Sequence, residues 1–411
     1  MIKKPNITII HYSCPPIVGG VETVIEEHAE LFSSRGYKIN LIVGKGEKFD
    51  KNVPVAIIPE MYSLENINNK INGELDKNIV SDLFNKRVET LYKKLKKKLS
   101  KTDVCIIHNI LTMHLNMPLT AALVKIIKDT NIKFISWSHD ATFNDPLYNI
   151  KKRTTFPYNF ISQQIKKVTY VTVSNYRQNK LSNLFKVNKK NIKVIPNGIN
   201  LVKLLNLNKH SLKIFEDFNL FREDLVMFAP TRIVKRKNLK DAIKITLMLN
   251  KLGKKSKLIV TGPPNPHILS DREYYAELKK LAKDKVIFLH EYKLGGKRGH
   301  IDQGIIRDLY ILCDLLLFPS SEEGFGIPLL EAGIFNLLII CSNIEPFKEL
   351  CGKDVFYIDI MKKDYKKIAK DIIKYFDSHL TVNMFKKVVR NYRWESIFET
   401  EIEPLINSLK R

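Results

Sequence analysis

The sequence predicts an α/β protein with two domains, each a parallel sheet with helices on both faces. Short apolar runs alternate with helical patterns along the first half of the chain, and the alternation starts again after a Pro-Asn-Gly turn at 196–198. The 411 residues are enough for two domains of roughly 200 residues each. We expect a first domain over 1–200, a second over 201–385 and a C-terminal helix over 386–411.

The chain opens with a strand–turn–helix–strand pattern. Ile7–Ile10 is predicted to be a buried strand, and the loop after it ends in Gly19 and Gly20. A helix with one apolar face follows and ends at Gly36, before a strand at Ile39–Val43. Adjacent glycines let backbone amides approach a phosphate or sugar closely, although a tight turn alone would also explain them.

The rest of the first half continues the alternation. We expect strands at Val104–His108, Phe134–Ser138 and Tyr170–Ser174, and helices near 118–128 and 161–167. In parallel sheets ligands bind beyond the carboxyl ends of the strands. Polar side chains that directly follow these strands are therefore candidates for binding or catalysis.

Two of these strand ends carry polar clusters. His108 and Asn109 end one strand, and His139 and Asp140 follow the next. A lone histidine is usually structural, but histidines at successive strand ends on the ligand-binding edge favour a functional role. No His or Cys set has the spacing of a zinc site, so we expect no metal.

The second half repeats the pattern after a polar, weakly periodic stretch over 201–222 that we expect to be a connecting segment. Strands are predicted at Val226–Ala229, Leu258–Val260, Val286–Leu289, Leu315–Phe318 and Leu338–Cys341, with a helix over 239–252. The segment Glu291–Gln303 is rich in glycine and basic residues, and it fits either a mobile flap or a passive insertion.

The loop after Leu315–Phe318 has the features of an anion site. It contains Gly324 and Gly326, and Pro328 stands where a helix would begin. The backbone N–H groups near 325–327 are then free of helical partners and lie at the positive end of the helix dipole, which suits a phosphate.

Charged residues flank this loop and a second strand end. Glu323 lies in the loop, and Glu331 is expected in the first helical turn, where it could reach the mouth of the loop or only complement the helix dipole. Arg232 and Lys237 follow the Val226–Ala229 strand, where they could clamp a diphosphate. In a chain with a net charge of +25 they could equally be surface charge.

The two glutamates, with seven residues between them around Gly-Phe-Gly-Ile-Pro, resemble the signature of retaining glycosyltransferases of the GT-B fold, family 4. Arg232 and Lys237 match the basic pair of that family, with Asn238 in place of its usual glycine and able to cap the next helix. The resemblance implies two Rossmann-like domains that face each other across a cleft, with the C-terminal helix crossing back to the first domain.

The resemblance also assigns roles to residues. It implies catalytic roles for Glu323, His139, Arg232 and Lys237. It implies donor binding by Gly19, Gly20, Arg232, Lys237, Gly262, Glu323, Gly324, Phe325, Gly326, Ile327 and Glu331, and acceptor binding by His108, Asn109 and Asp140. The expected reaction moves a hexose, glucose or mannose, from a nucleotide-diphosphate sugar to a hydroxyl acceptor without metal or cofactor.

Other activities remain open from the sequence. A nucleotide-sugar epimerase, a phosphorylase or a non-catalytic nucleotide-sugar or glycan-binding protein would share the fold. The acceptor could be a small molecule, a glycan or a lipid-linked sugar.

Charge and hydropathy bear on location. The lysines around Leu83–Leu99 fit a solvated helix face, or else contact with an anionic membrane surface; no motif accompanies the charge that would indicate nucleic-acid binding. Without a predicted signal peptide, membrane span or paired cysteines, we expect a cytoplasmic protein. If the lysines contact a membrane, we expect it to be peripheral to the inner face of that membrane.

Overall fold

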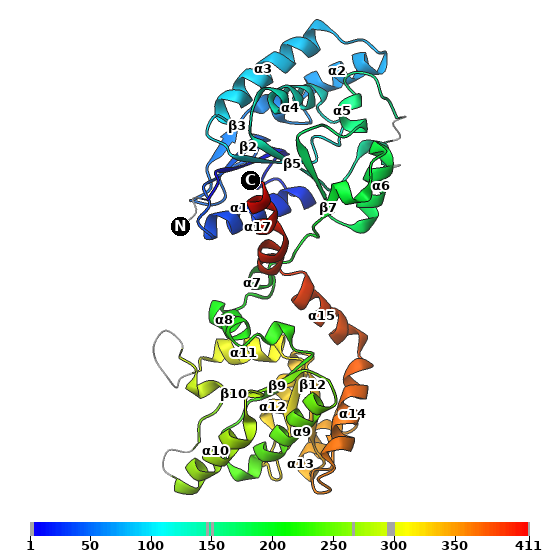
Figure 1. Ribbon diagram of the computed structural model, residues 1–411. Helices are drawn as coiled ribbons and strands as arrows, with labels where there is room; N and C mark the ends of the chain where they lie inside the picture. The colour runs from blue at the N-terminus through cyan, green and yellow to red at the C-terminus, as the bar shows by residue number, and fades with distance from the viewer. Residues whose placement is uncertain (1–3, 145–147, 149–151, 265–267, 294–300, 410–411) are drawn as a thin grey trace. The chain divides into compact units, whose positions relative to one another are not determined.

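The computed structural model describes residues 4–144, 148, 152–264, 268–293 and 301–409. The chain divides into two compact units, one formed by Met1–Ile199 with Tyr392–Arg411 and the other by Asn200–Asn391. Each unit is built on one parallel sheet with helices around it, which confirms the predicted α/β class (Figure 1).

The first unit contains a seven-stranded sheet in the order β3-β2-β1-β4-β5-β6-β7. Its central strands are apolar and β-branched, and Ile9 of β1 lies in register with Leu41 on one side and Ile106 on the other. The strands are β1 Ile7–Ser13, β2 Ile39–Lys45, β3 Val55–Ile57, β4 Val104–His108, β5 Lys133–Ser138, β6 Val168–Thr172 and β7 Ile192–Val194.

The helices of this unit are α1 Gly20–Ser34, α2 Asn66–Asp76, α3 Asp82–Lys98, α4 Met117–Asp129, α5 Asn159–Ser162 and α6 Asn175–Phe185. Side-chain caps start three of them: Ser81 accepts a hydrogen bond from a backbone N–H of α3, Asn116 from one of α4 and Ser174 from one of α6. The helix predicted over 161–167 is wrong, because α5 ends at Ser162.

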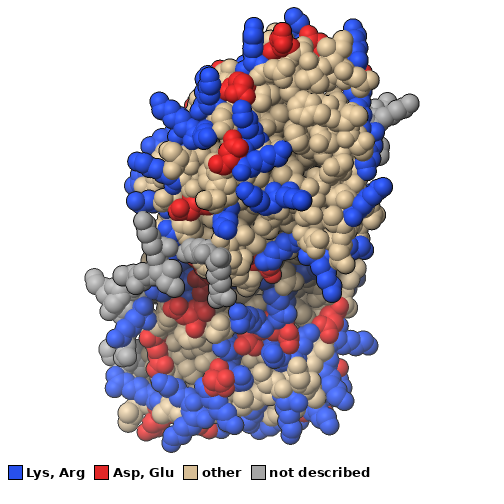
Figure 2. All heavy atoms as spheres, turned by 45° about the horizontal axis from the view of Figure 1, so that its top comes forward, with Lys and Arg blue, Asp and Glu red and all other residues tan. Residues whose placement is uncertain are grey.

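Helix α3 shows the amphipathic pattern that its lysines suggest. Phe84, Leu91 and Leu95 are buried, whereas Lys96, Lys97 and Lys98 fill its last turn, where cations complement the helix dipole. Figure 2 shows Lys and Arg side chains spread over the visible face of both units. Membrane contact through this basic surface stays a prediction.

The C-terminal segment packs into the core of the first unit. It comprises α16 Trp394–Ile397, a π-helical turn at Phe398–Ile402 and α17 Glu403–Ser408. Phe398 and Ile406 are fully buried, and the Phe398 ring lies 5.0 Å from that of Phe32, centroid to centroid. The predicted boundary at 386 falls inside α15, Leu380–Asn391, which belongs to the second unit.

The second unit contains a six-stranded parallel sheet in the order β10-β9-β8-β11-β12-β13. Its strands are β8 Leu225–Ala229, β9 Ser256–Val260, β10 Val286–Phe288, β11 Leu315–Phe318, β12 Leu338–Ser342 and β13 Phe356–Ile358. Its helices are α7 Leu201–Leu205, α8 Lys209–Asp217, α9 Leu239–Lys251, α10 Leu269–Ala282, α11 Gln303–Leu312, α12 Ile327–Ile334, α13 Glu345–Cys351, α14 Tyr365–Asp377 and α15.

The stretch over 201–222, which we predicted to be a connecting segment, lies within the second unit. It forms α7 and α8, and Ile214 and Phe215 of α8 are buried. The fully buried carboxylate of Asp308 accepts hydrogen bonds from the Asn208 backbone and the Ser211 hydroxyl, both at 2.7 Å, which fixes the start of α8. None of the helices in the described ranges is both long and apolar enough to cross a membrane.

Candidate active site

The glycine loop of the second unit has the predicted geometry. Strand β11 ends at Phe318, and Gly326 precedes α12 with φ 109°, a left-handed conformation that favours glycine. Pro328 follows at the second helical position. Within the described residues, the backbone N–H groups of 325–327 have no protein acceptor, so they are available to an anion.

Glu323 lies at the centre of a small charged cluster. One carboxylate oxygen accepts hydrogen bonds from the Lys237 ammonium and, at 2.9 Å, from the Ser320 hydroxyl. Its other oxygen lies 3.3 Å from Nη1 of Arg236. The side chains of Glu323 and Lys237 are only 11% and 12% exposed, so water screens this ion pair little. The structure thus brings together two predicted residues from separate strand ends.

Arg236 was not among the predicted site residues. Its guanidinium also donates to the Glu322 carbonyl at 3.0 Å, and its own carbonyl accepts from the backbone N–H and hydroxyl of Ser321 at 2.8 and 3.1 Å. Arg236 therefore ties the loop that carries Glu323 to the 3-10 turn Lys235–Lys237. In a chain so rich in basic residues, no local pattern separates it from surface charge.

Asn238 does not cap α9 as expected. It has φ 49°, the left-handed conformation that glycine would adopt easily, and its side-chain amide donates to the Pro319 carbonyl at 3.0 Å instead. The residue thus replaces glycine by tolerating the same backbone geometry and adds a link to the end of β11.

Arg232 and Gly262 lie at the carboxyl ends of β8 and β9. A Cβ atom at Gly262 would come within 2.8 Å of Arg232 Cα and 2.7 Å of the Thr231 carbonyl, so only glycine fits there. The Arg232 side chain is exposed, and it makes no hydrogen bond or ion pair with another described residue. Its guanidinium is therefore free to bind a ligand.

Glu331 is placed differently from the prediction. Because α12 begins at Ile327, Glu331 lies beyond the first turn. It is half-buried, and Oε2 accepts a hydrogen bond from the Tyr310 hydroxyl at 2.6 Å. This bond fixes the direction of the carboxylate. Like the contacts of Arg236, it was not predicted from the sequence.

In the first unit, Asn109 organises the ends of β4 and β5. It has φ 58°, and its Oδ1 accepts hydrogen bonds from the backbone N–H groups of His139 at 2.8 Å and Asp140 at 3.2 Å. His139 Nε2 lies 3.1 Å from His108 Nδ1, and the two rings stack. The predicted cluster is therefore one connected network.

His108 cannot reach an acceptor directly, because it is fully buried beneath His139. Burial lowers the pKa of His139 to about 3 and that of His108 well below 6.5, with neighbouring histidines adding to both effects. Both rings are thus neutral at neutral pH. His139 can exchange hydrogen bonds with a ligand but brings no charge, and His108 holds it in place.

Two further contacts complete this edge of the sheet. The Asp140 carboxylate accepts a hydrogen bond from Arg177 of α6 at 2.6 Å. Glu22 of α1 accepts one from Ser13 at 2.6 Å and folds over Gly19, where an added Cβ would collide with the carboxylate. Gly20 has open space beside it. Neither Glu22 nor Arg177 was identified from the sequence.

The glycines and basic residues of the Glu291–Gln303 segment, at 295–299, lie outside the described residues. Among the residues that the structure does describe, no three His, Cys, Asp or Glu side chains gather as metal ligands would.

Each half of the chain matches a family of known proteins. The chain matches the family described as "Glycosyl transferases group 1" over residues 211–392 and that described as "Glycosyltransferase Family 4" over residues 18–203. It is 28% identical over 280 residues to the mannosylglucosylglycerate synthase of Petrotoga mobilis, a match that covers 63% of each chain.

Two more similarities span most of the chain. The mannosylglucosylglycerate synthase of Thermotoga maritima is 23% identical, with 84% of this chain and 82% of that protein covered. Among solved structures, a sucrose-phosphate synthase from Thermosynechococcus elongatus is 14% identical, with 99% of each chain covered and a TM-score of 0.38.

Proposed function

The chain belongs to the glycosyl transferases group 1 family of the GT-B type, and we propose that it moves a hexose from a nucleotide-diphosphate sugar to a hydroxyl acceptor with retention of configuration. The observation that carries the proposal is Glu323 paired with Lys237 beside the free amides of 325–327. Mannose is the favoured sugar, since the names of the relatives include mannosylglucosylglycerate synthases and an O-antigen mannosyltransferase.

The cations and amides of the second unit would stabilise the leaving diphosphate. Negative charge develops on its oxygens as the bond to the sugar breaks, and preorganised donors lower the barrier most when they are aimed at that charge. Arg232 offers a fork of donors, Lys237 a point charge, and 325–327 the backbone amides. We propose that these groups do so without a metal ion.

The carboxylates and the first unit would hold the sugar and the acceptor. In the absence of a donor, Lys237 neutralises Glu323; when Lys237 pairs with the diphosphate, Glu323 can accept hydrogen bonds from sugar hydroxyls. Glu331, oriented by Tyr310, would bind the ribose. His139 would position the sugar as a neutral group, and Asn109 and Asp140 would shape the acceptor site.

The test is release of free nucleotide from a panel of GDP-, UDP- and ADP-sugars. It should include glucosylglycerate as one acceptor, because a mannosyl group added to it would give the product named in the relatives. Glu323→Ala should abolish release, whereas Glu322→Ala is the matched control, since Arg236 contacts only the Glu322 carbonyl. Activity should survive EDTA; loss that a divalent ion restores would contradict the metal-free mechanism.

If no sugar transfer is detected, other results of the same assays would identify the alternative function. Donor-dependent thermal stabilisation without release would indicate a nucleotide-sugar binding protein. Conversion of one nucleotide sugar into another would indicate an epimerase, and a requirement for inorganic phosphate would indicate a phosphorylase.

A further inference from the structure

An apolar cavity of about 370 Å³ lies in the first unit between the end of α4 and the segment 159–167. Val124 and Ile127 form one wall, and both are almost fully buried. Phe160 and Ile165, each half-buried, form the other. The volume and the apolar lining are typical of a small-molecule site.

One wall of the cavity is formed by the segment over 161–167, which is not the helix that was expected there. Helix α5 ends at Ser162, and Gln163 continues in an extended conformation, with φ −136° and ψ 154°. The backbone N–H of Ile165 then donates to the Tyr170 hydroxyl at 3.2 Å, and Tyr170 is itself fully buried. This bond fixes the backbone of Ile165, one of the residues that line the cavity.

Positive charge surrounds the cavity. Lys128, Lys166 and Lys167 line it, and its described lining includes no Asp or Glu. The Lys167 ammonium lies 3.5 Å from the Lys128 carbonyl, which brings two of these residues to the same rim. The other polar residues of the lining are neutral amides, Asn159, Gln163 and Gln164, so every charge at the rim is positive. Apolar walls with a positively charged rim complement a ligand that has a hydrocarbon body and an anionic end.

The cavity is separate from the candidate active site. Its residues come just before the first residues of β5 and β6, Lys133 and Val168, and so lie at the amino edge of the sheet. Asn109 and His139 lie at the opposite, carboxyl edge. A ligand here would not be the substrate of the proposed reaction.

We propose that this cavity binds the hydrocarbon chain of a single-chain anionic amphiphile of the fatty-acid type, with its carboxylate at the lysine rim. Burial of the ligand chain and of the half-exposed Phe160 and Ile165 would supply the affinity, with Val124 and Ile127 as van der Waals contacts, and the lysines would select the charged head group. The inference does not depend on the proposed transferase activity.

The experiment measures, by fluorescence, how ligands displace dansyl-labelled undecanoic acid from the full chain. All ligands are kept below their critical micelle concentrations. Laurate should compete for a saturable site, and 1-dodecanol, of equal chain length but uncharged, should compete more weakly. Val124→Trp, which fills the cavity, should abolish binding. The Lys128→Gln/Lys166→Gln pair should weaken laurate by roughly tenfold and leave 1-dodecanol unchanged.

Lys125→Gln is the matched control, because Lys125 lies on the same helix but pairs with Glu89 instead of lining the cavity. If Val124→Trp does not fold, the lysine pair still decides the question. Absence of saturable binding, equal loss with Lys125→Gln, or recruitment to anionic vesicles without binding of monomeric laurate would overturn the proposal.

Discussion

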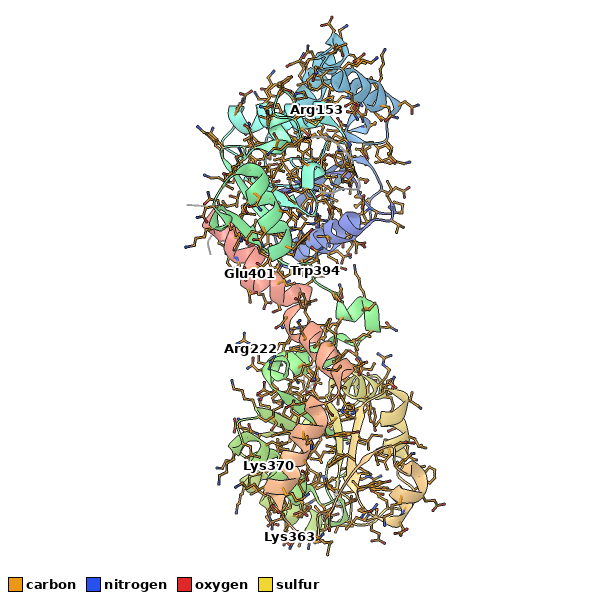
Figure 3. All side chains as sticks on the ribbon, turned by 90° about the vertical axis from the view of Figure 1, so that its right-hand side faces the viewer. Arg153, Arg222, Lys363, Lys370, Trp394 and Glu401 are labelled. Carbon is orange, nitrogen blue, oxygen red and sulfur yellow. The ribbon has the colours of Figure 1, made fainter. Side chains whose placement is uncertain are left out.

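His28 and Trp394 pack edge to face, with 5.0 Å between their ring centroids, although they lie near opposite ends of the chain. Figure 3 shows Trp394 on the C-terminal segment, and its helix α16 contacts α1, which carries His28. Gly198 also packs closely against the indole, because a Cβ there would come within 2.5 Å of the ring. The C-terminal segment therefore packs on the first unit through Trp394, whose neighbour His28 is a titratable residue.

His28 should make the first unit sensitive to acid. Burial lowers its pKa to about 3 from the ordinary 6.5, and both ring nitrogens are buried without a partner in the described residues. Below pH 6.5 the unfolded chain binds a proton that the folded chain refuses, so the free energy of unfolding falls as the pH drops from about 6.5 to about 3. His28→Phe should lessen this fall by up to about 1.4 kcal/mol per pH unit.

Urea unfolding of the first unit at pH 7 and pH 5 would measure the effect. His210→Gln, at an exposed position in the second unit, is the control and should leave the difference unchanged. An unaltered pH dependence in His28→Phe would show that His11, His108 and His139 account for the acid sensitivity without His28.

Asn238 should tolerate glycine better than alanine. Both substitutions remove the hydrogen bond to the Pro319 carbonyl, so their difference reports the strain at φ 49°. An alanine there should make the second unit less stable than glycine by about 1 kcal/mol. Chemical unfolding of both variants gives the difference, and equal stabilities would mean that the turn relaxes into another conformation.

Arg232→Ala and Lys237→Ala should each lower kcat/KM for the donor by about a hundredfold or more, because each removes a cation expected at the leaving diphosphate. Lys235→Ala is the matched control, since Lys235 is exposed in the same turn and contacts neither Glu322 nor Glu323. Steady-state kinetics with the donor found in the nucleotide panel would measure these effects. Wild-type kinetics in both test variants would remove the proposed clamp.

The strands and the glycine loop could be predicted because local sequence decides them. Leu315–Phe318 is apolar throughout, as a strand covered on both faces must be, and Gly326 marks a backbone angle that other residues adopt only with strain. The same local rules brought Arg232, Lys237 and Glu323 to strand ends. They could not show that Lys237 pairs with Glu323, which depends on the packing of β8 beside β11.

The predictions that failed concern segments whose structure depends on residues outside them in the sequence. The pattern at 161–167 suits a helix, but the hydroxyl of Tyr170 holds the backbone of Ile165 in another conformation. The stretch at 201–222 was predicted to be a connecting segment because Asp308, which anchors the start of α8, comes far later in the chain. His108 was expected to meet the acceptor, and only the stacking of His139 above it shows that it is buried.

Arg236 should be a positioning residue for Glu323. Lys237 cannot hold Glu323 and a diphosphate equally well, so once the donor binds, the contacts from Arg236 and Ser320 must keep the carboxylate in place. Arg236→Ala should therefore lower kcat by about tenfold, since a small displacement of a catalytic group is costly. KM for the donor should change little.

Arg236→Lys tests how the residue acts. Both contacts come from Nη1 of Arg236. Lysine keeps the charge, but its ammonium lies on a shorter and more flexible side chain without the rigid guanidinium plane, so it should restore only part of kcat. Thermal unfolding of both variants separates positioning from folding: a purely structural role would lower the melting temperature and the fraction of active protein while kcat per active site stayed at the wild-type value. Full kcat in Arg236→Ala would show that Ser320 alone is enough to hold Glu323.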